Sequence, residues 1–432
     1  MKLSVLTTLI LGATAVFSQE HHRCMTPQFI SYQESLTPGY EKAVTTTFNE
    51  AKTLNAKSNS IYTIPVVVHI VHNTPAQNID DSVVFDQIRV LNEDYNRLNA
   101  DTVNMRADFD IVKGSPKIKF KLAQIDEFGS PTTGITRTAT STTSFGSSAL
   151  FTGDFSDLEK VKSTADGGHD PWDTTRYLNI WVCNMAIDFF GQEIPALLGY
   201  ATPPSGLANW PAGSTDGLID GVVIQYQAFG SNNPNPLDAG SGPVDVMGRT
   251  PTHEVGHYLG LRHIWGDGDC AAEDGIDDTP NADAESQQDC DPSKNTCTDN
   301  IQGTDLPDMI ENYMDYSAET CQNSFTEGQV SLMHGVLEGP RFDLVHGNPA
   351  IVNELTAISW EAYPNPTKGE LHIKSADNLT SVSVYDLSGK MLLNNSISGN
   401  EHDIQLNDLS SGVYLLEVAS ENGKSQKRIV KQ

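Results

Sequence analysis

Residues 253–263 read His253-Glu254-Val255-Gly256-His257-Tyr258-Leu259-Gly260-Leu261-Arg262-His263, and they decide how the rest of the chain is interpreted. Histidines four residues apart share one helical face, because an α-helix turns once every ~3.6 residues. His253 and His257 can therefore hold one metal ion. Gly260 can adopt a positive φ, which ends the helix and returns His263 as a third ligand. Three protein ligands with an open fourth position are typical of a catalytic zinc site.

Glu254 lies beside the first histidine, close enough to bind a water on the ion without being a ligand. The alternative is a core helix that happens to carry histidines, since short motifs match by accident. The extended motif fixes five positions, the helix-ending glycine among them, so chance explains it poorly.

Composition narrows the class of protein. The chain has 432 residues, which suits two or three domains. Its 56 acidic residues outnumber its 27 basic ones, giving a formal net charge of −29. A nucleic-acid-binding protein needs the opposite balance, and the sequence has no basic stripe, so we expect no nucleic-acid partner. The acidic excess is compatible with an extracellular protein that holds calcium.

Residues 1–18 have the pattern of a secretory signal peptide. Lys2 supplies the positive start, an apolar stretch follows, and Val16 and Ser18 are small enough to precede a cleavage site. A membrane helix is the alternative, but the run is short and does not recur, so we expect no transmembrane segment in the mature protein. Export implies an oxidising compartment, where disulfides are allowed.

Residues 19–57 are weakly patterned, with one helix-like run over 41–54, and are interpreted as a pro-segment. Cys24 stands far from the other cysteines in the sequence. Because a thiolate is a soft zinc ligand, we hypothesise that Cys24 occupies the open zinc position in a zymogen and excludes water. A disulfide to Cys183, or an unpaired thiol, is the alternative.

Residues 58–345 are expected to form the catalytic domain, an α+β fold. Apolar and alternating runs predict strands over residues 64–71, 117–125, 177–183, 198–201 and 221–226. Helical spacing over 81–98 predicts an amphipathic helix packed on the sheet through Val84, Phe85, Ile88, Leu91 and Tyr95. The order of these elements predicts a twisted mixed sheet with helices behind it. Thr326 and Gln329 predict a capping box for a helix that ends near Glu338.

An acidic, glycine-rich loop follows the histidine motif, over residues 265–280. Clustered carboxylates on a flexible loop suit Ca²⁺, a hard cation that takes six to eight oxygen ligands. The spacing is not that of an EF-hand. We expect Asp274 and Thr279 to be ligands; a solvated acidic loop is the alternative.

Four cysteines, Cys270, Cys290, Cys297 and Cys321, lie in and around this loop. They allow three disulfide pairings. A second zinc site is the alternative, but no C-x-x-C pair is present and export favours oxidation.

The sequence changes character at His346. We expect a linker over residues 346–358 and a separate domain over residues 359–432. Short alternating strands joined by glycine turns predict a small β-sandwich.

The histidine motif followed by Met314 resembles the metzincin clan of metallopeptidases, in which a Met-turn underlies the metal. Within the clan, residues 58–345 are similar to the pappalysin family, through the stretches Leu178–Cys183, Asp277–Pro280, Asn312–Tyr316 and Cys321 with Phe325–Gln329. The expected fold is therefore a metzincin-like catalytic domain, with active-site helix and Met-turn, plus the β-domain.

The pappalysin resemblance implies roles for individual residues. His253, His257 and His263 would bind zinc, and Glu254 would be the general base. Tyr316 would lie near the metal. The resemblance further implies calcium near the acidic loop, disulfides Cys270–Cys297 and Cys290–Cys321, and, in several members, cleavage before Arg associated with an acid near Cys321. Here the nearby pair is Glu319-Thr320.

The tail resembles the type A sorting domain of the type IX secretion system of Bacteroidetes. The matching stretches are Tyr363–Gly369, Tyr385–Lys390 and Gly412–Tyr414. The resemblance implies export across the outer membrane by the secretion machinery, usually followed by removal of the tail. A carbohydrate-binding or adhesive β-domain is the alternative.

These observations predict a secreted zinc endopeptidase that is made as a zymogen and acts on proteins or peptides. One rival is a non-catalytic, zinc-bearing surface or adhesion protein, which would have no need for the glutamate base. The other is a zinc hydrolase with a non-peptide substrate.

Overall fold

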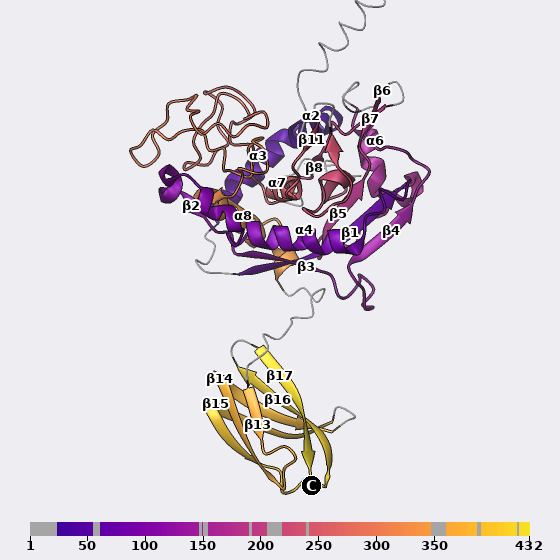
Figure 1. Ribbon diagram of the computed structural model, residues 1–432, viewed down its shortest axis with the longest axis vertical. Coiled ribbons are helices and arrows are strands. Elements are labelled where there is room, and N and C mark those ends of the chain that lie inside the picture. Colours follow the sequence, from indigo (N-terminus) through magenta and orange to yellow (C-terminus); the bar gives the residue numbers. More distant parts are fainter. Residues whose placement is uncertain are drawn as a thin grey trace, which may run out of the picture. The chain divides into compact units, whose positions relative to one another are not determined.

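The computed structural model describes residues 24–54, 61–146, 149, 154–189, 192–204, 218–238, 242–346, 360–386, 390–420 and 423–432. The expected signal peptide and most of the expected linker lie outside these residues. The chain divides into two compact units, Met1–Ile351 and Val352–Gln432 (Figure 1). Within the described residues, no helix is both long enough and apolar enough to cross a bilayer.

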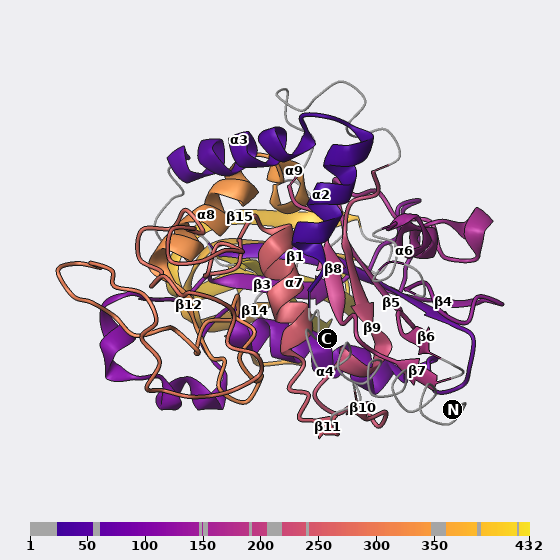
Figure 2. The same ribbon diagram turned by 90° about the horizontal axis from the view of Figure 1, so that it is seen from above.

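The described part of the first unit begins with two helices, α2 (Thr26–Leu36) and α3 (Tyr40–Thr53), separated by Gly39 at a φ of 99°. Helix α3 coincides with the helix-like run noted in the sequence. Helix α2 was not predicted, because only Thr26 and Phe29 of this helix are buried and the rest has little apolar periodicity. Both helices pack on the catalytic fold, with α2 beside strand β8 (Figure 2).

The centre of this unit is a six-stranded mixed sheet. Its order is β3 (Ile118–Leu122), β1 (Tyr62–His72), β5 (Leu178–Cys183), β9 (Val222–Gln225) and β8 (Gly199–Ala201), with β4 (Ile135–Ala139) also pairing with β1. All pairs are parallel except β8 with β9, so β8 is an antiparallel edge strand. The predicted mixed sheet is confirmed. Its apolar runs are buried because helices and loops cover both faces.

Three helices complete the core on one face of the sheet: α4 (Asp81–Asp94), α7 (Arg249–Tyr258) and α8 (Glu327–Glu338). Helix α8 begins with the predicted capping box, in which the Gln329 N–H donates to Thr326 Oγ1 at 3.2 Å and the Thr326 N–H donates to Gln329 Oε1 at 2.9 Å. Helix α4 differs from the prediction at Phe85, which is 55% exposed, because Val83 and Val84 take the inward positions of the first turn.

Shorter elements connect these parts. They are η1 (Ala100–Asn104), η2 (Ala107–Ile111), β2 (Lys113–Gly114), α6 (Ser156–Glu159), η3 (Lys160–Lys162), η4 (Thr164–Asp166), β6 (Ile187–Phe189), β7 (Gln192–Ile194), η5 (Tyr226–Ala228), β10 (Leu237–Asp238), β11 (Pro243–Val244), β12 (Phe325–Thr326) and α9 (Phe342–Val345).

A second core lies on the other face of the sheet. Successive strand residues point to opposite faces, so Tyr200 of β8 faces this core while Ala201 belongs to the first. Met25 and Phe29, near the first described residue, are buried in the second core.

The segment between α7 and β12 contains no helix or strand, and all of it is described. It is cross-linked by disulfides Cys270–Cys297 and Cys290–Cys321, the pairing that the pappalysin resemblance implied. Covalent links therefore constrain a segment that has little apolar content of its own.

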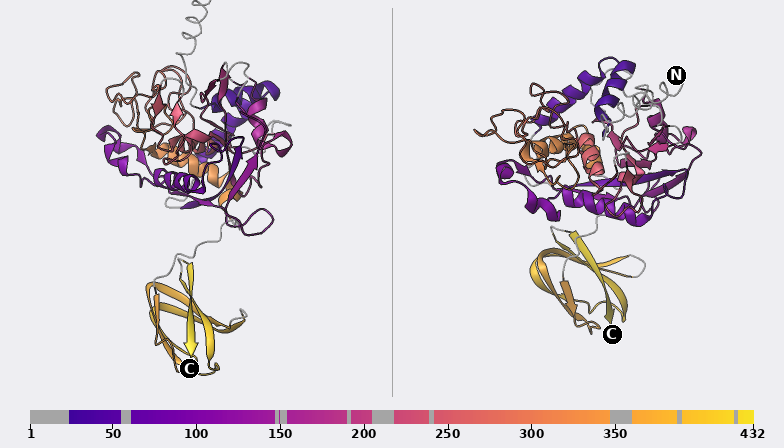
Figure 3. Two further views of the ribbon diagram at one scale, coloured as in Figure 1. Left: turned by 45° about the vertical axis from the view of Figure 1, so that its right-hand side comes forward. Right: turned by 45° about the horizontal axis from the view of Figure 1, so that its top comes forward.

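The second unit is an antiparallel β-domain. Strands β13 (Trp360–Tyr363), β14 (Glu370–Tyr385), β16 (Gly412–Ser420) and β17 (Gly423–Lys431) follow one another in the sheet, and β15 (Met391–Gln405) pairs with β14. Register shifts in β14 between Lys374 and Ser381 accompany a bend, and the strands curve around one apolar core (Figure 3).

Candidate active site

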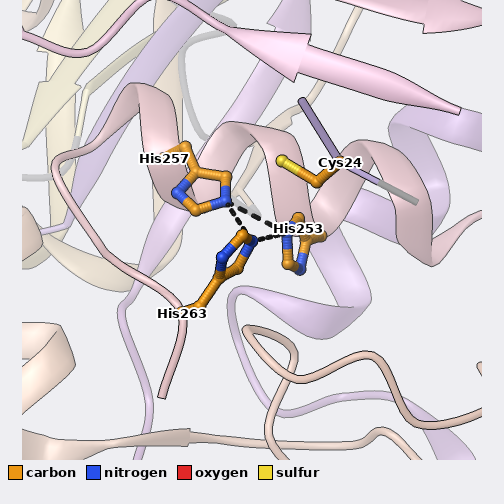
Figure 4. A group of neighbouring side chains, drawn as sticks. All are labelled: Cys24, His253, His257 and His263. Carbon is orange, nitrogen blue, oxygen red and sulfur yellow. Dashed lines mark hydrogen bonds between the residues drawn. The ribbon is translucent and has the colours of Figure 1, made fainter. Parts of the chain in front are cut away.

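Three imidazole rings meet at one point. Helix α7 carries His253 and His257 on one face, and Gly260, with a φ of 92°, turns the chain so that His263 returns to them (Figure 4). The Nε2 atoms lie 3.1 Å apart for His257–His253 and His257–His263, and 3.2 Å apart for His253–His263. All three side chains are buried.

The outer nitrogens of these rings all have acceptors. His253 Nδ1 lies 2.7 Å from the Tyr313 carbonyl, His257 Nδ1 lies 2.8 Å from the Leu261 carbonyl, and His263 Nδ1 lies 2.6 Å from Asp267 Oδ1. Each Nδ1 therefore faces a hydrogen-bond acceptor, and the three Nε2 atoms converge on one point.

Burial, followed by the neighbouring His263, lowers the pKa of His257 to about 3, so this ring stays neutral. A neutral imidazole is the form that binds a metal. Three converging nitrogen lone pairs fit a zinc-type cation, because such an ion accepts all three pairs at once. The donor set thus matches a zinc site with three protein ligands.

Cys24 lies over the same point. Its Sγ and the ligand nitrogens of the three histidines all lie within 4.8 Å of one another. The Cys24 thiol is also 3.3 Å from Glu254 Oε2. Cys183 is a separate buried free thiol in the second core, so the alternative Cys24–Cys183 disulfide is not formed in this structure.

The backbone around Cys24 occupies the edge strand of the sheet. Cys24 bridges to Gly199 of β8, and the Met25 N–H donates to the Gly199 carbonyl at 3.0 Å. The Thr26 hydroxyl donates to Glu254 Oε2 at 3.2 Å and accepts from the Ala201 N–H at 2.9 Å. The first described residues thus form hydrogen bonds with β8, the edge strand along which an extended substrate peptide could bind.

Glu254 is fully buried and lies against Gly199. A Cβ on Gly199 would lie 2.7 Å from Glu254 Cγ and 2.9 Å from its Oε1. Only glycine therefore lets the edge strand pass this close to the carboxylate. Sequence reasoning missed this role, because nothing local links two residues so far apart in the chain.

Met314 lies beneath helix α7. Its sulfur would stand 2.4 Å from a Cβ at Gly256, and its N–H donates to Asn312 Oδ1 at 2.9 Å. The Asn312 side chain in turn donates to Gln329 Oε1 at 2.9 Å, which joins this turn to the start of α8.

Tyr316, two residues after this methionine, lies beside the histidines. Its ring centroid is 4.9 Å from that of His263 and 5.7 Å from that of His253. Its hydroxyl accepts from the Cys24 N–H at 3.2 Å and donates to the Cys24 carbonyl at 3.0 Å. Burial, then the nearby Cys24, raises the pKa of Tyr316 well above its ordinary value, so the hydroxyl keeps its proton and can donate it in a hydrogen bond.

Two residues at the start of the acidic loop contact His263. Asp267 accepts from His263 Nδ1, and the Trp265 ring stacks on His263 at 4.3 Å with a 5° tilt. A carboxylate behind a metal-binding histidine fixes its orientation and makes it a better ligand. The signal for this role was available, since Asp267 lies four residues beyond the third histidine.

Glu319 holds the start of helix α7. Its Oε2 accepts from the Met247 N–H at 2.6 Å and the Arg249 N–H at 3.1 Å, and its Oε1 accepts from the Thr250 N–H at 2.9 Å and hydroxyl at 2.8 Å. The residue is 7% exposed. Its carboxylate is therefore engaged by the helix N-terminus.

Asp274 and Thr279 lie in one turn of the acidic loop. Asp274 Oδ1 accepts from the Thr279 hydroxyl and the Ile276 N–H, each at 2.8 Å. Asp274 Oδ2 is buried and has no hydrogen-bond partner among the described residues. Burial raises the pKa of Asp274 to about 7. One buried carboxylate oxygen thus remains for another ligand.

Comparison with known proteins places these features in a family. Residues 162–338 match the family described as pregnancy-associated plasma protein-A, and residues 361–432 match the secretion system C-terminal sorting domain. An extracellular metalloprotease of Uncinocarpus reesii is 30% identical over 276 residues, which cover 63% of this chain and 75% of that protein. One from Arthroderma benhamiae is 27% identical over 77% of this chain and 89% of its own length.

Two solved structures extend this likeness. Mature mirolysin of Tannerella forsythia in complex with a cleaved peptide is 41% identical, with a TM-score of 0.55, over 67% of this chain and 97% of that one. A promirolysin mutant from the same organism is 38% identical, with a TM-score of 0.60, over 75% of this chain and 97% of that one. The chain therefore belongs to the pregnancy-associated plasma protein-A (pappalysin) family and is a zinc metalloprotease secreted by means of its C-terminal sorting domain.

Proposed function

We propose that this chain is an endopeptidase, made as a zymogen, whose zinc is held by His253, His257 and His263. The observation that supports this proposal is the convergence of the three Nε2 atoms beside the Glu254 carboxylate. Zinc bound there would act as a Lewis acid that polarises a peptide carbonyl and lowers the pKa of a water.

The residues around the zinc position have separate roles in the reaction. Glu254 accepts the proton of the attacking water and passes it to the leaving amine. The Tyr316 hydroxyl donates a hydrogen bond to the oxygen that gains charge on the substrate carbonyl. Met314 supports the histidines from below. Asp267 orients His263 through the 2.6 Å contact with its Nδ1.

Latency is proposed to come from residues 19–57. The Cys24 sulfur lies within 4.8 Å of the histidine nitrogens, which supports a role as the fourth zinc ligand. It also fills the space beside Glu254 that a water would need. A zinc ion would favour the thiolate form of Cys24. Cleavage near Ser58 would allow this segment to leave the catalytic domain, residues 58–345.

Calcium is proposed to bind the acidic loop through Asp274 and Thr279. The buried Oδ2 of Asp274 has no hydrogen-bond partner among the described residues, which supports a cation ligand there. Such an ion would order a segment that otherwise depends on its two disulfides.

The two ends of the chain are proposed to direct secretion. Residues 1–18 would direct crossing of the inner membrane, and residues 359–432 would engage the type IX secretion machinery of a Bacteroidetes-type bacterium. The linker over 346–358 would be the place where the tail is removed. Proteins and peptides outside the cell would be the substrates.

A casein-degradation assay on the activated protein tests the peptidase proposal. We expect chelation to abolish activity and zinc to restore it. Glu254→Ala should lower the rate by about 10²–10⁴-fold, the usual contribution of a general base, while the zinc content stays at one per chain. Glu193→Ala, at an exposed carboxylate, is the matched control. Undiminished proteolysis by Glu254→Ala would reject the assignment.

A further inference from the structure

Helix α2 inserts one of its faces into the second core of the catalytic unit. Met25 and Phe29 are 3% and 0% exposed, and with Tyr32 they lie at spacings of four and three residues, on one helical face. The receiving side chains belong to the catalytic unit and include Phe155, Trp181 and Tyr200.

Phe29 occupies the centre of this contact. Its ring centroid is 5.5 Å from that of Tyr200, and the Lys162 Nζ is 5.6 Å from the Phe29 centroid. The same ammonium lies 4.9 Å from the Tyr200 ring and 5.7 Å from the Trp181 ring. An aromatic ring in this position is stabilised in two ways: its apolar surface is buried, and its face attracts a cation that is shielded from water.

Lys162 is held independently of Phe29. Its Nζ pairs with Glu159 Oε1 at 2.9 Å and donates to the Ile219 carbonyl at 2.9 Å, and Lys162 is 0% exposed. Glu159 also accepts from the Tyr200 hydroxyl at 2.8 Å. These partners all belong to the catalytic unit, so the cation and its aromatic neighbours remain in place when Phe29 departs.

This position adjoins the edge strand. Gly199 and Ala201 of β8 form hydrogen bonds with Met25 and Thr26, while Tyr200, between them, faces the Phe29 position. A polypeptide that replaces residues 24–26 along β8 therefore has this apolar site within a few residues of the zinc position. Departure of the pro-segment would expose this apolar site, and exposed apolar patches mark binding surfaces.

We propose that the position filled by Phe29 in the zymogen is a substrate subsite in the activated enzyme, and that it takes an aromatic side chain of the substrate polypeptide a few residues from the scissile bond. The inference rests on the proposed function, because it requires the pro-segment to leave. In the precursor, Phe29 occupies the subsite in place of a substrate residue.

The first test uses peptides of residues 24–54 as inhibitors of the activated enzyme, from which residues 19–57 have been removed. All carry Cys24→Ala, so that no thiol reaches the metal, and they differ at Phe29: unchanged, replaced by cyclohexylalanine, or Phe29→Ala. We expect Phe29→Ala to raise the inhibition constant about tenfold or more, with cyclohexylalanine between the two because it keeps the apolar volume and loses the ring quadrupole. Ser31→Ala, at an exposed position of α2, is the matched control.

The second test profiles cleavage sites in a denatured protein mixture. We expect Phe, Tyr and Trp to be enriched at one fixed distance from the cut. A flat profile, or equal inhibition by the unchanged and Phe29→Ala peptides, would overturn the subsite. An activated chain that cleaves no polypeptide would instead reject the proposed function, which distinguishes the two failures.

Discussion

Met314 lies directly against Gly256, so closely that a Cβ at position 256 would stand 2.4 Å from the methionine sulfur. Helix α7 therefore rests on the Met-turn at the one residue between its two histidines that has no side chain. The separation between the histidine-bearing helix and this turn depends on that contact.

Gly256→Ala should destabilise the protein by about 1–3 kcal/mol, the usual cost of overpacking a core. Helix propensity alone predicts a gain of about 1 kcal/mol, so the sign of the effect tests the contact. Urea denaturation and zinc content measure it. Gly412→Ala, where an added Cβ would meet only ordinary contacts of 3.6 Å or more, serves as the control.

Cys24→Ala should give the uncleaved precursor measurable peptidase activity, at least about tenfold above the unmodified precursor, because the fourth zinc position is then open to water. The contacts of Thr26 and α2 remain, so activity should stay below that of the activated enzyme. A short fluorogenic assay, with gels to confirm that the precursor stays intact, measures the effect. Cys183→Ala, at the other buried free thiol, is the control. An equally latent Cys24→Ala precursor contradicts the hypothesis.

Glu319→Ala should cost about 2–4 kcal/mol, because it leaves the first N–H groups of α7 without their acceptor. The same variant should bind zinc more weakly, since His253 lies in the helix that Glu319 anchors. Urea unfolding and a competition assay with a chelator report the two effects. Glu327→Ala, at an exposed carboxylate in the first turn of α8, should change stability by less than about 0.5 kcal/mol.

Asp274 should make stability depend on pH when calcium is absent. Burial raises the pKa of Asp274 from 3.8 to about 7, so the folded state holds this proton more tightly than the unfolded state does. Stability from this group is present below about pH 4 and is lost as the pH rises toward 7. Calcium needs the carboxylate, so its affinity should fall about tenfold per unit below pH 7.

Thermal unfolding across this pH range, with calcium and with chelator, measures both effects of Asp274. Asp274→Asn should remove the calcium response and flatten the pH dependence, whereas Asp166→Asn, at an exposed side chain, should do neither. An equal calcium response at pH 5.5 and pH 8 would contradict the assignment of this site.

Features encoded locally could be predicted from the sequence. The spacing of His253, His257 and His263 predicts their convergence, and the Thr326 capping box is confirmed because it depends on four consecutive residues. The mixed sheet is confirmed because its strands are apolar runs. Helix α2 was missed because its few buried residues make contact with another part of the chain.

Contacts between segments far apart in the sequence could not be predicted from local sequence patterns. Gly199 approaches Glu254, and Glu319 caps the helix that begins at Arg249, through tertiary packing that leaves no local signature. Phe85 was placed in the core because helical spacing identifies a stripe of apolar residues without fixing which edge of the stripe turns inward.

The two disulfides overlap in sequence, since Cys290 lies inside the loop closed by Cys270 and Cys297. Breaking any one peptide bond between Cys270 and Cys321 therefore leaves both parts of the chain joined by at least one sulfur bridge. This segment has no helix or strand, and its exposed parts are the kind of stretch where proteolytic nicking concentrates. A cut made there by another molecule of the same enzyme would release no fragment, because the disulfides would still join the two parts of the chain.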